Sequence, residues 1–162
     1  MKKDYGPKAW YLTRLGWIQL SSMDCVLTAM QFVKENQVEG KGERNHFTDE
    51  VYRQLQDYFM GQRQRFDIPL KLLGTLFQQK VWRALCAIPY GETRSYKQIA
   101  EFINHPKAAR AIGSANHNNP IAVIVPCHRV IGSNGRLTGY AGGLLLKKSL
   151  LELEQKESGS IL

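Results

Sequence analysis

The 162-residue sequence predicts an α+β fold in two parts, a small N-terminal β-sheet with a helix and a mostly helical C-terminal part. β-Branched and aromatic residues interrupted by turn formers dominate residues 10–33, whereas helical periodicity dominates after about residue 70. Two short predicted helices in the later half are joined by a tight turn and followed by a short strand. We therefore expect an N-terminal α/β supporting domain at 1–70 and a winged-helix-like domain with a helix-turn-helix at 71–162.

The N-terminal part is expected to contain a hairpin or meander, a loop and a helix, in that order. Residues 10–33 carry the strand pattern, and the polar residues 34–46 with their two glycines indicate the loop. Thr48 is a suitable N-cap for the next helix, whose apolar side chains lie on one face. That face comprises Val51, Leu55, Tyr58 and Phe59. Residues 63–70 then predict a short strand that ends at Pro69.

The C-terminal part begins with a helix that Pro89 and Gly91 end. Its apolar stripe comprises Phe77, Val81, Leu85 and Ile88. Cys86 lies beside the stripe and is expected to be a packed thiol. The pattern Ser95-x-x-Gln98 predicts a capping box at the start of the next helix.

Three further elements are expected after the helix that starts at Ser95. A helix restarts within residues 104–120, with Pro106 in its first turn. Residues 121–125 are short and apolar, which indicates a buried strand, and residues 144–157 have the composition of a final helix.

Charge and composition narrow the class of protein. Lys and Arg number 22 against 14 Asp and Glu, a formal net charge of +8. Such a balance suits a protein that meets an anionic polymer, although it also serves solubility alone. No apolar run reaches the about 20 residues of a membrane helix, and the N-terminus does not resemble a signal peptide. We expect a cytoplasmic protein without a membrane partner.

The three cysteines, Cys25, Cys86 and Cys127, are too few and too widely spaced for a disulfide framework. No CxxC or HxxxH pair is present, so no metal site is expected. The sequence also has no phosphate-binding glycine motif for a nucleotide, and no cofactor is expected.

The helix expected within residues 104–120 is unusual in its small side chains. Only Lys107 and Arg110 are long near its start. The small residues are Ala108, Ala109, Ala111, Gly113 and Ser114. Small side chains let a helix approach a partner closely, and that partner is either another helix of the chain or the narrow minor groove of DNA. In the second case Arg110 could enter the base stack.

Cys127 stands between Pro126 and His128, where the predicted strand ends. The usual cytosolic cysteine is a small buried hydrophobe. The positive neighbours His128 and Arg129 would instead lower the thiol pKa. Because adjacent strand residues point to opposite faces, Cys127 and His128 would need a bend or a bridging water to act together. This local pattern leaves a Cys/His hydrolase open.

The motif PCHRV at Pro126 to Val130 resembles the signature of O6-alkylguanine-DNA alkyltransferases. The resemblance extends to the stretches 54–70, 77–100, and 106–143, and covers roughly residues 52–154. It implies a DNA repair protein that binds double-stranded DNA through a minor-groove helix-turn-helix and flips out an alkylated guanine. The alkyl group would pass irreversibly to Cys127 in a single, self-inactivating turnover, with O4-alkylthymine as a further candidate substrate.

The resemblance also implies roles for individual residues. Cys127 would accept the alkyl group, His128 would act as base through a water, and Glu154 would orient the histidine. Asn119 would join the recognition helix to the cysteine, and Tyr96 would donate to the leaving guanine. Arg110 would fill the vacated stack. Val130, Tyr140 and Ala141 would line the pocket.

The recognition helix would supply the remaining DNA contacts. These residues are Lys107, Ala108, Ala109, Ala111, Gly113 and Ser114. Ala141 departs from the serine common in the family, so one hydroxyl contact is absent. The protein is expected to act as a monomer. Two alternatives remain: a lesion sensor that binds alkylated DNA without modifying Cys127, and a hydrolase that turns over and ignores DNA.

Overall fold

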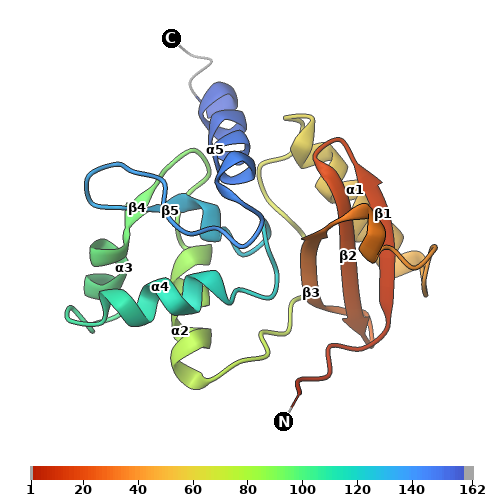
Figure 1. Cartoon of the computed structure of the whole chain (residues 1–162), viewed down its shortest axis with the longest axis horizontal. Helices are drawn as coiled ribbons and strands as arrows, with labels where there is room; N and C mark the ends of the chain where they lie inside the picture. The colour runs from red at the N-terminus through yellow and green to blue at the C-terminus, as the bar shows by residue number, and fades with distance from the viewer. Residues whose placement is uncertain (1, 159–162) are drawn as a thin grey trace. The chain divides into compact units, whose positions relative to one another are not determined.

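The computed structural model describes residues 2–158, whose contacts divide the chain into two compact units. The first comprises Met1–Leu73 with Pro120–Ala122, and the second comprises Gly74–Asn119 with Val123–Leu162. The first unit is a three-stranded sheet with a helix and the second is mostly helical, so the predicted α+β class is confirmed (Figure 1). Among the described residues, no helix is long and apolar enough to span a membrane.

The sheet of the first unit is an antiparallel meander of β1 (Lys8–Thr13), β2 (Gly16–Met23) and β3 (Val26–Val33). The turn between β2 and β3 places Asp24 and Cys25 at φ values of 51° and 60°. Two successive positive φ values match the twist of a tight hairpin. The predicted meander is therefore confirmed.

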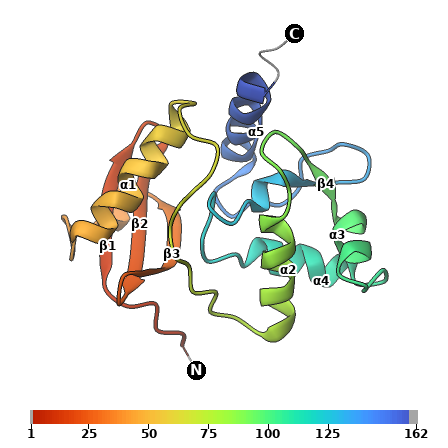
Figure 2. The same ribbon diagram turned by 180° about the vertical axis from the view of Figure 1, so that it is seen from behind.

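Helix α1 (His46–Phe59) covers this sheet and starts earlier than predicted (Figure 2). A short 3₁₀ turn, η1 (Glu35–Gln37), interrupts the loop before it. Asn45 is the N-cap of α1: its side chain accepts from the Thr48 amide, and the Thr48 hydroxyl accepts from the Asn45 amide. The prediction of Thr48 as N-cap was wrong because Thr48 fills the third helical position of this capping box. All four predicted core residues of the helix are buried.

The strand predicted over residues 63–70 does not form. The Gln54 side chain accepts from the Asp67 amide at 2.9 Å and donates to the Asp67 carbonyl at 3.2 Å. These bonds satisfy the Asp67 backbone, which a neighbouring strand would otherwise pair. Only Leu70 makes an isolated bridge, to Leu27 of β3.

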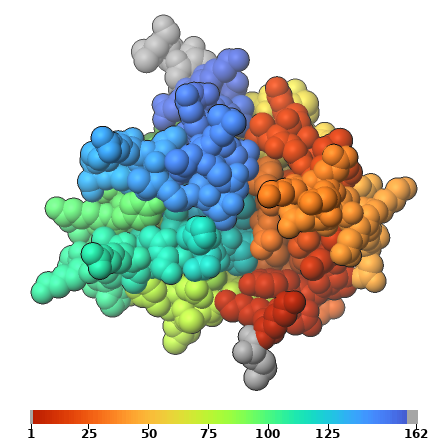
Figure 3. All heavy atoms as spheres, in the orientation of Figure 1, coloured from red at the N-terminus to blue at the C-terminus, as the bar shows by residue number. Residues whose placement is uncertain are grey.

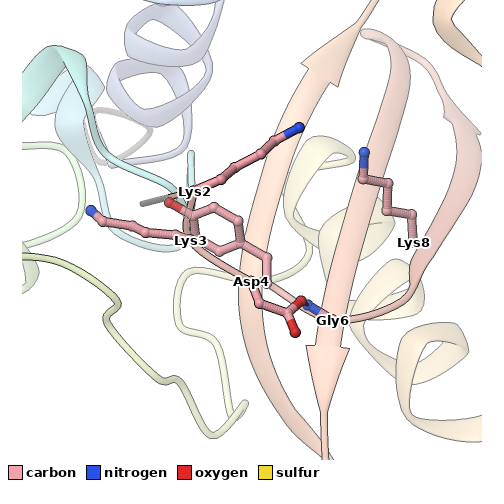
Figure 4. A pocket seen from close by; sticks show the side chains of 6 residues that line it. Lys2, Lys3, Asp4, Gly6 and Lys8 are labelled. Carbon is pink, nitrogen blue, oxygen red and sulfur yellow. Dashed lines mark hydrogen bonds between the residues drawn. The ribbon is translucent and has the colours of Figure 1, made fainter.

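A surface pocket of the first unit is lined by the basic N-terminal segment (Figure 4). Lys2, Lys3 and Lys8 extend around it, and Asp4 is the acidic residue among its lining side chains. Lys3 donates to the carbonyl oxygen of Leu73 at 3.2 Å. The lysines of this pocket add to the positive charge of the chain.

The second unit begins with α2 (Leu76–Cys86), the two-residue strand β4 (Arg94–Ser95) and α3 (Tyr96–Phe102). The predicted capping box of Ser95 and Gln98 is confirmed, since each side chain accepts from the backbone amide of the other. Cys86, the last residue of α2, is exposed, so the predicted packed thiol was wrong. Its position at the helix end lies outside the buried stripe of α2.

Helix α4 (Ala109–His117) packs against α2 and α3. It starts later than predicted, with Ala108 as N-cap, and Pro106 lies in the preceding turn rather than in the first helical turn. The Ala108 amide donates to the His105 carbonyl at 2.9 Å, which closes this turn. Helices α3 and α4 thus form the expected helix pair joined by a short connection.

Residues 121–125 are largely buried but do not form the predicted strand. Val123 has a φ of 68°, in a region that a β-branched residue rarely adopts, and the chain turns there. A 3₁₀ turn, η2 (Cys127–Arg129), and β5 (Val130–Ile131) follow. Strand β5 pairs in parallel with β4.

The last element is α5 (Leu144–Ser158), as predicted for residues 144–157. Lys147, Leu150 and Glu154 are its fully buried or nearly fully buried residues. Their spacing of three and four positions places them on one helical face. Two charged side chains therefore share the buried face of this helix with a leucine.

Candidate active site

Cys127 is the first residue of η2 and is 5% exposed. Its amide donates to the Val125 carbonyl at 2.8 Å, and the Arg129 amide donates to the Pro126 carbonyl at 3.0 Å. With about three residues per 3₁₀ turn, successive side chains diverge by about 120° rather than alternating as in a strand. The chain therefore bends at Cys127 and His128, and their side chains do not point to opposite faces as they would in a strand.

The side chains of His128 and Glu154 meet in the buried interior of the second unit. Their closest atoms, His128 Nε2 and Glu154 Oε2, are 2.7 Å apart. His128 is fully buried and Glu154 is 1% exposed. A carboxylate can only accept, so His128 Nε2 carries the hydrogen and the lone pair of the neutral ring is on Nδ1.

Arg129 binds the same carboxylate in a bidentate ion pair. Its Nε donates to Glu154 Oε1 at 2.8 Å and its Nη2 donates to Oε2 at 3.0 Å. Its Nη1 donates to the Ile88 carbonyl at 2.8 Å, and the Gly91 amide donates to Glu154 Oε1 at 3.3 Å. Glu154 therefore accepts from His128, Arg129 and the Gly91 amide.

These contacts set the charges of the pair. Burial acts to raise the pKa of Glu154, but hydrogen bonds from His128 and Arg129 outweigh it and lower that pKa to about 2. Burial lowers the pKa of His128, against the opposing effect of Glu154. At neutral pH the site holds a carboxylate and a neutral imidazole.

Burial raises the pKa of the Cys127 thiol, in contrast to the lowering predicted from its positive neighbours. The prediction was wrong because the thiol lies in the interior, where desolvation disfavours a thiolate more than nearby charges favour it. The Asn119 side chain and the Lys147 ammonium partly oppose this effect. The resting site therefore holds a thiol.

Lys147 is a buried cation next to the cysteine. Its Nζ donates to the carbonyl oxygens of Val130 at 2.6 Å and Thr138 at 2.9 Å. Burial lowers its pKa to about 8, while Cys127 acts in the opposite direction. Lys147 thus ties β5 and the glycine-rich stretch 132–143 to α5.

Tyr96 and Tyr140 present hydroxyl groups near the same segments. The Tyr96 hydroxyl donates to the Thr138 carbonyl and accepts from the Thr138 hydroxyl, both at 3.2 Å. Tyr140 is 9% exposed, and burial together with the adjacent Cys127 raises its pKa well above the usual value. Both tyrosines are candidate hydrogen-bond donors.

Two amides at the end of α4 contact the backbone around Cys127. Asn119 Nδ2 donates to the Val125 carbonyl at 2.8 Å, and Asn116 Nδ2 donates to the Cys127 carbonyl at 3.2 Å. Asn116 is 3% exposed. The helix with the small side chains is thus bonded directly to the turn that carries the cysteine.

The outer surface of α4 is open. The exposed predicted residues are Lys107, Ala109, Arg110, Ala111 and Ser114, while Ala108 and Gly113 are half-buried. A Cβ atom on Gly113 would lie 3.9 Å from the Tyr96 ring, which is an ordinary van der Waals contact with α3. Figure 3 shows the teal atoms of α4 and the blue atoms of the glycine-rich stretch on one exposed face.

The structure thus gathers the buried Cys127, His128 and Glu154 with the half-buried Asn119, and Tyr140 lies beside the cysteine. Val130 and Tyr96 join it through the bonds of Lys147 and Thr138. Arg110 and Ala141 are exposed and contact none of this group by hydrogen bond.

Sequence reasoning missed three of the polar residues that hold the site. These are Asn116, Arg129 and Lys147. Long cations are rarely buried, so only the position of Arg129 beside His128 gave a signal, and it suggested an effect on the thiol rather than on Glu154. In residues 2–158 no group of three His, Cys, Asp or Glu side chains could share a metal ion.

Two family profiles match the chain. The profile described as 6-O-methylguanine DNA methyltransferase, DNA binding domain, matches residues 76–156. The one described as 6-O-methylguanine DNA methyltransferase, ribonuclease-like domain, matches residues 8–72. Together they extend over most of the sequence.

Similar proteins carry the same description. Methylated-DNA–protein-cysteine methyltransferase of Mycobacterium bovis is 48% identical over 150 residues, covering 89% of each chain. The Methanosarcina barkeri protein of that name is 58% identical over 113 residues, 70% of this chain and 72% of its own. A crystal structure of the Mycobacterium tuberculosis protein in complex with DNA matches with a TM-score of 0.82 and 46% identity over 93% of both chains. The chain belongs to the 6-O-methylguanine DNA methyltransferase family.

Proposed function

We propose that this protein repairs DNA by transferring the alkyl group of O6-alkylguanine irreversibly to its own Cys127. Family membership and the similarity to a relative crystallised with DNA support a methylated-DNA–protein-cysteine methyltransferase. The observation that carries the assignment to Cys127 is its place in η2 next to the buried His128–Glu154 pair.

The reaction is a displacement at the alkyl carbon. His128, as the neutral base, takes the thiol proton of Cys127 through a water, while Glu154 accepts from its Nε2 and stabilises the imidazolium that forms. The sulfur forms a bond to the carbon, and the carbon–oxygen bond breaks with its electron pair left on guanine. The leaving group takes up one proton and becomes guanine, which balances the proton that the thiol gives up. The thioether is stable, so the protein acts once.

The guanine pocket would be formed by segments on both sides of the cysteine. Tyr96 would donate to the leaving guanine in place of its present bond to Thr138. The Val130 backbone would read the base edge, and Tyr140 and Ala141 would line the pocket. Ala141 offers no hydroxyl, so its backbone N–H is the group left to donate there.

The partner would be double-stranded DNA containing the alkylated base. The small, exposed residues of α4 suit the narrow minor groove, and Arg110 would enter the stack that the flipped nucleotide leaves. Asn119 would transmit the position of α4 to the cysteine turn. In this proposal residues 71–162 bind DNA and accept the alkyl group, residues 1–70 support them, and the protein works as a cytoplasmic monomer.

Stoichiometry tests this proposal against its alternatives. A duplex with one O6-methylguanine is mixed in excess with the protein, and restored guanine is measured over time. Alkyl transfer predicts restored guanine equal to the protein added and no more. Repeated turnover would instead favour a hydrolase, and tight binding without restoration would favour a lesion sensor.

A further inference from the structure

Arg129 is a second buried cation at the candidate active site, and the proposed reaction gives it no part. It is 7% exposed, and all three guanidinium nitrogens donate to buried acceptors at 2.8 to 3.0 Å. Two of these bonds go to Glu154, the same carboxylate that accepts from His128. Arg129 and His128 are therefore linked through one shared carboxylate.

A carboxylate facing a histidine alone would favour the protonated ring. A buried imidazolium–carboxylate pair satisfies both charges, and such a histidine could not accept a proton from a thiol. Arg129 changes this balance because its fixed charge already neutralises Glu154. Both carboxylate oxygens are bonded to the guanidinium, and Oε2 also accepts from His128 Nε2.

The charged groups that act on His128 lie on η2 and α5, and the titratable hydroxyls of Tyr90 and Tyr140 lie near Arg129 and Cys127. Cys127 and Arg129 flank it in η2, and Lys147 and Glu154 face it from α5. Glu154 favours the charged ring, whereas Arg129, Lys147 and burial favour the neutral ring, so that the pKa of His128 lies below its usual value. With Arg129 removed, Glu154 would act on His128 without this opposition.

We propose that Arg129 is a positioning residue that holds and neutralises Glu154, and thereby keeps His128 uncharged and able to accept the Cys127 proton. The inference rests on the proposed alkyl transfer for its kinetic consequence. Its direct consequence, a neutral His128 at neutral pH, concerns the protein alone and does not need DNA.

The test compares two substitutions that separate charge from packing. Arg129→Gln removes the charge, and Arg129→Lys keeps it while losing the bidentate geometry. The matched control is Arg53→Gln, because Arg53 makes a bidentate pair with Glu50 on the exposed surface of α1. Each protein is titrated by NMR of the His128 ring nitrogens, and single-turnover transfer from a methylated duplex is measured across pH.

The wild type and Arg53→Gln are expected to show a neutral His128 ring at neutral pH. In Arg129→Gln the pH at which His128 is half protonated should rise. The pH below which transfer slows should rise by the same amount. A rise of one unit would slow transfer about tenfold below both midpoints and leave it nearly unchanged well above them. Arg129→Lys should retain a midpoint close to that of the wild type even if its rate is lower at every pH.

Three outcomes would overturn the proposal. The first is a charged His128 ring in the wild type at neutral pH, which needs no variant and holds even if both substitutions prevent folding. The second is a folded Arg129→Gln with an unchanged midpoint and a rate lowered equally at every pH, as a purely structural role predicts. The third is an equal rise in both Arg129 variants. If the wild type transfers no methyl group at all, the proposed function fails, whereas the NMR midpoints still decide the role of Arg129.

Discussion

Asn116 on α4 donates a hydrogen bond from Nδ2 to the backbone carbonyl of Cys127 at 3.2 Å, although eleven residues separate them. Asn119 makes a parallel link to the Val125 carbonyl at 2.8 Å. The helix proposed to lie against DNA is therefore bonded to the backbone on which the reactive sulfur is carried. DNA position and sulfur position are expected to be coupled through these two amides.

Replacing Arg110 should separate DNA binding from folding. The Arg110 side chain is exposed on α4, so Arg110→Ala should leave the free energy of unfolding within about 0.5 kcal/mol of the wild type. Affinity for a methylated duplex, or base flipping reported by a fluorescent base analogue, should fall by about tenfold or more. Urea unfolding and fluorescence anisotropy measure the two effects. A large loss of stability with unchanged DNA binding would contradict the insertion of Arg110 into the base stack.

Tyr96→Phe tests the proposed donor to the leaving guanine. The change removes only a hydroxyl, which bonds Thr138 in the free protein and would bond the base in the complex. The single-turnover rate at saturating DNA should fall by about tenfold to a hundredfold, with DNA affinity nearly unchanged. An unchanged rate in a rapid-quench experiment would show that the hydroxyl does not assist the leaving group.

Removing the charge of Glu154 should cost stability as well as activity. In Glu154→Gln the buried Arg129 loses its ion pair, so unfolding free energy should fall by about 3–5 kcal/mol. The folded-state pKa of Glu154 is depressed to about 2, so its stabilisation is present above the usual glutamate pKa and is lost as pH falls through about 2. Urea titrations from neutral to acidic pH should therefore show the gap between wild type and variant narrowing. A gap independent of pH would contradict the charged pair.

The wild type should gain a component of stability in mild alkali that Lys147→Met lacks. Burial lowers the pKa of Lys147 in the folded state from 10.5 to about 8. Between about pH 8 and 10.5 the unfolded chain therefore keeps a proton on Lys147 that the folded chain has lost. Stability from this group therefore rises with pH across that window. The difference in unfolding free energy between wild type and variant separates the contribution of Lys147 from that of the other titrating groups. No change in that difference between about pH 8 and 10.5 would place the lysine in water rather than in the interior.

Local patterns predicted the elements whose stabilising contacts are close in sequence. The β1–β3 meander follows from β-branched and aromatic residues interrupted by turn formers, and the capping box at Ser95 follows from residues three positions apart. Residues 63–70 were misassigned because the Gln54 side chain, 13 residues away, bonds the Asp67 backbone. Residues 121–125 were misassigned because Val123 adopts a backbone conformation that its residue type rarely takes.

The candidate site was predictable where a motif carries it and not where distant chain segments meet. Cys127 and His128 are adjacent in a recognisable motif, and Glu154 followed from the family resemblance. The burial of Arg129 and Lys147 depends on carbonyls and a carboxylate 9 to 41 residues away, which no spacing rule reveals. The raised thiol pKa likewise depends on burial of the whole turn rather than on the neighbouring residues.

Alkyl transfer to Cys127 is measured by the mass of the protein after reaction with a duplex that carries one O6-methylguanine. We expect a gain of one methylene per chain, saturating at one, with peptide mapping placing it on Cys127 and not on the exposed Cys25 or Cys86. Cys127→Ser should bind the duplex and show no gain. An unchanged wild-type mass, or a methyl group on either exposed cysteine, would contradict alkyl transfer to Cys127.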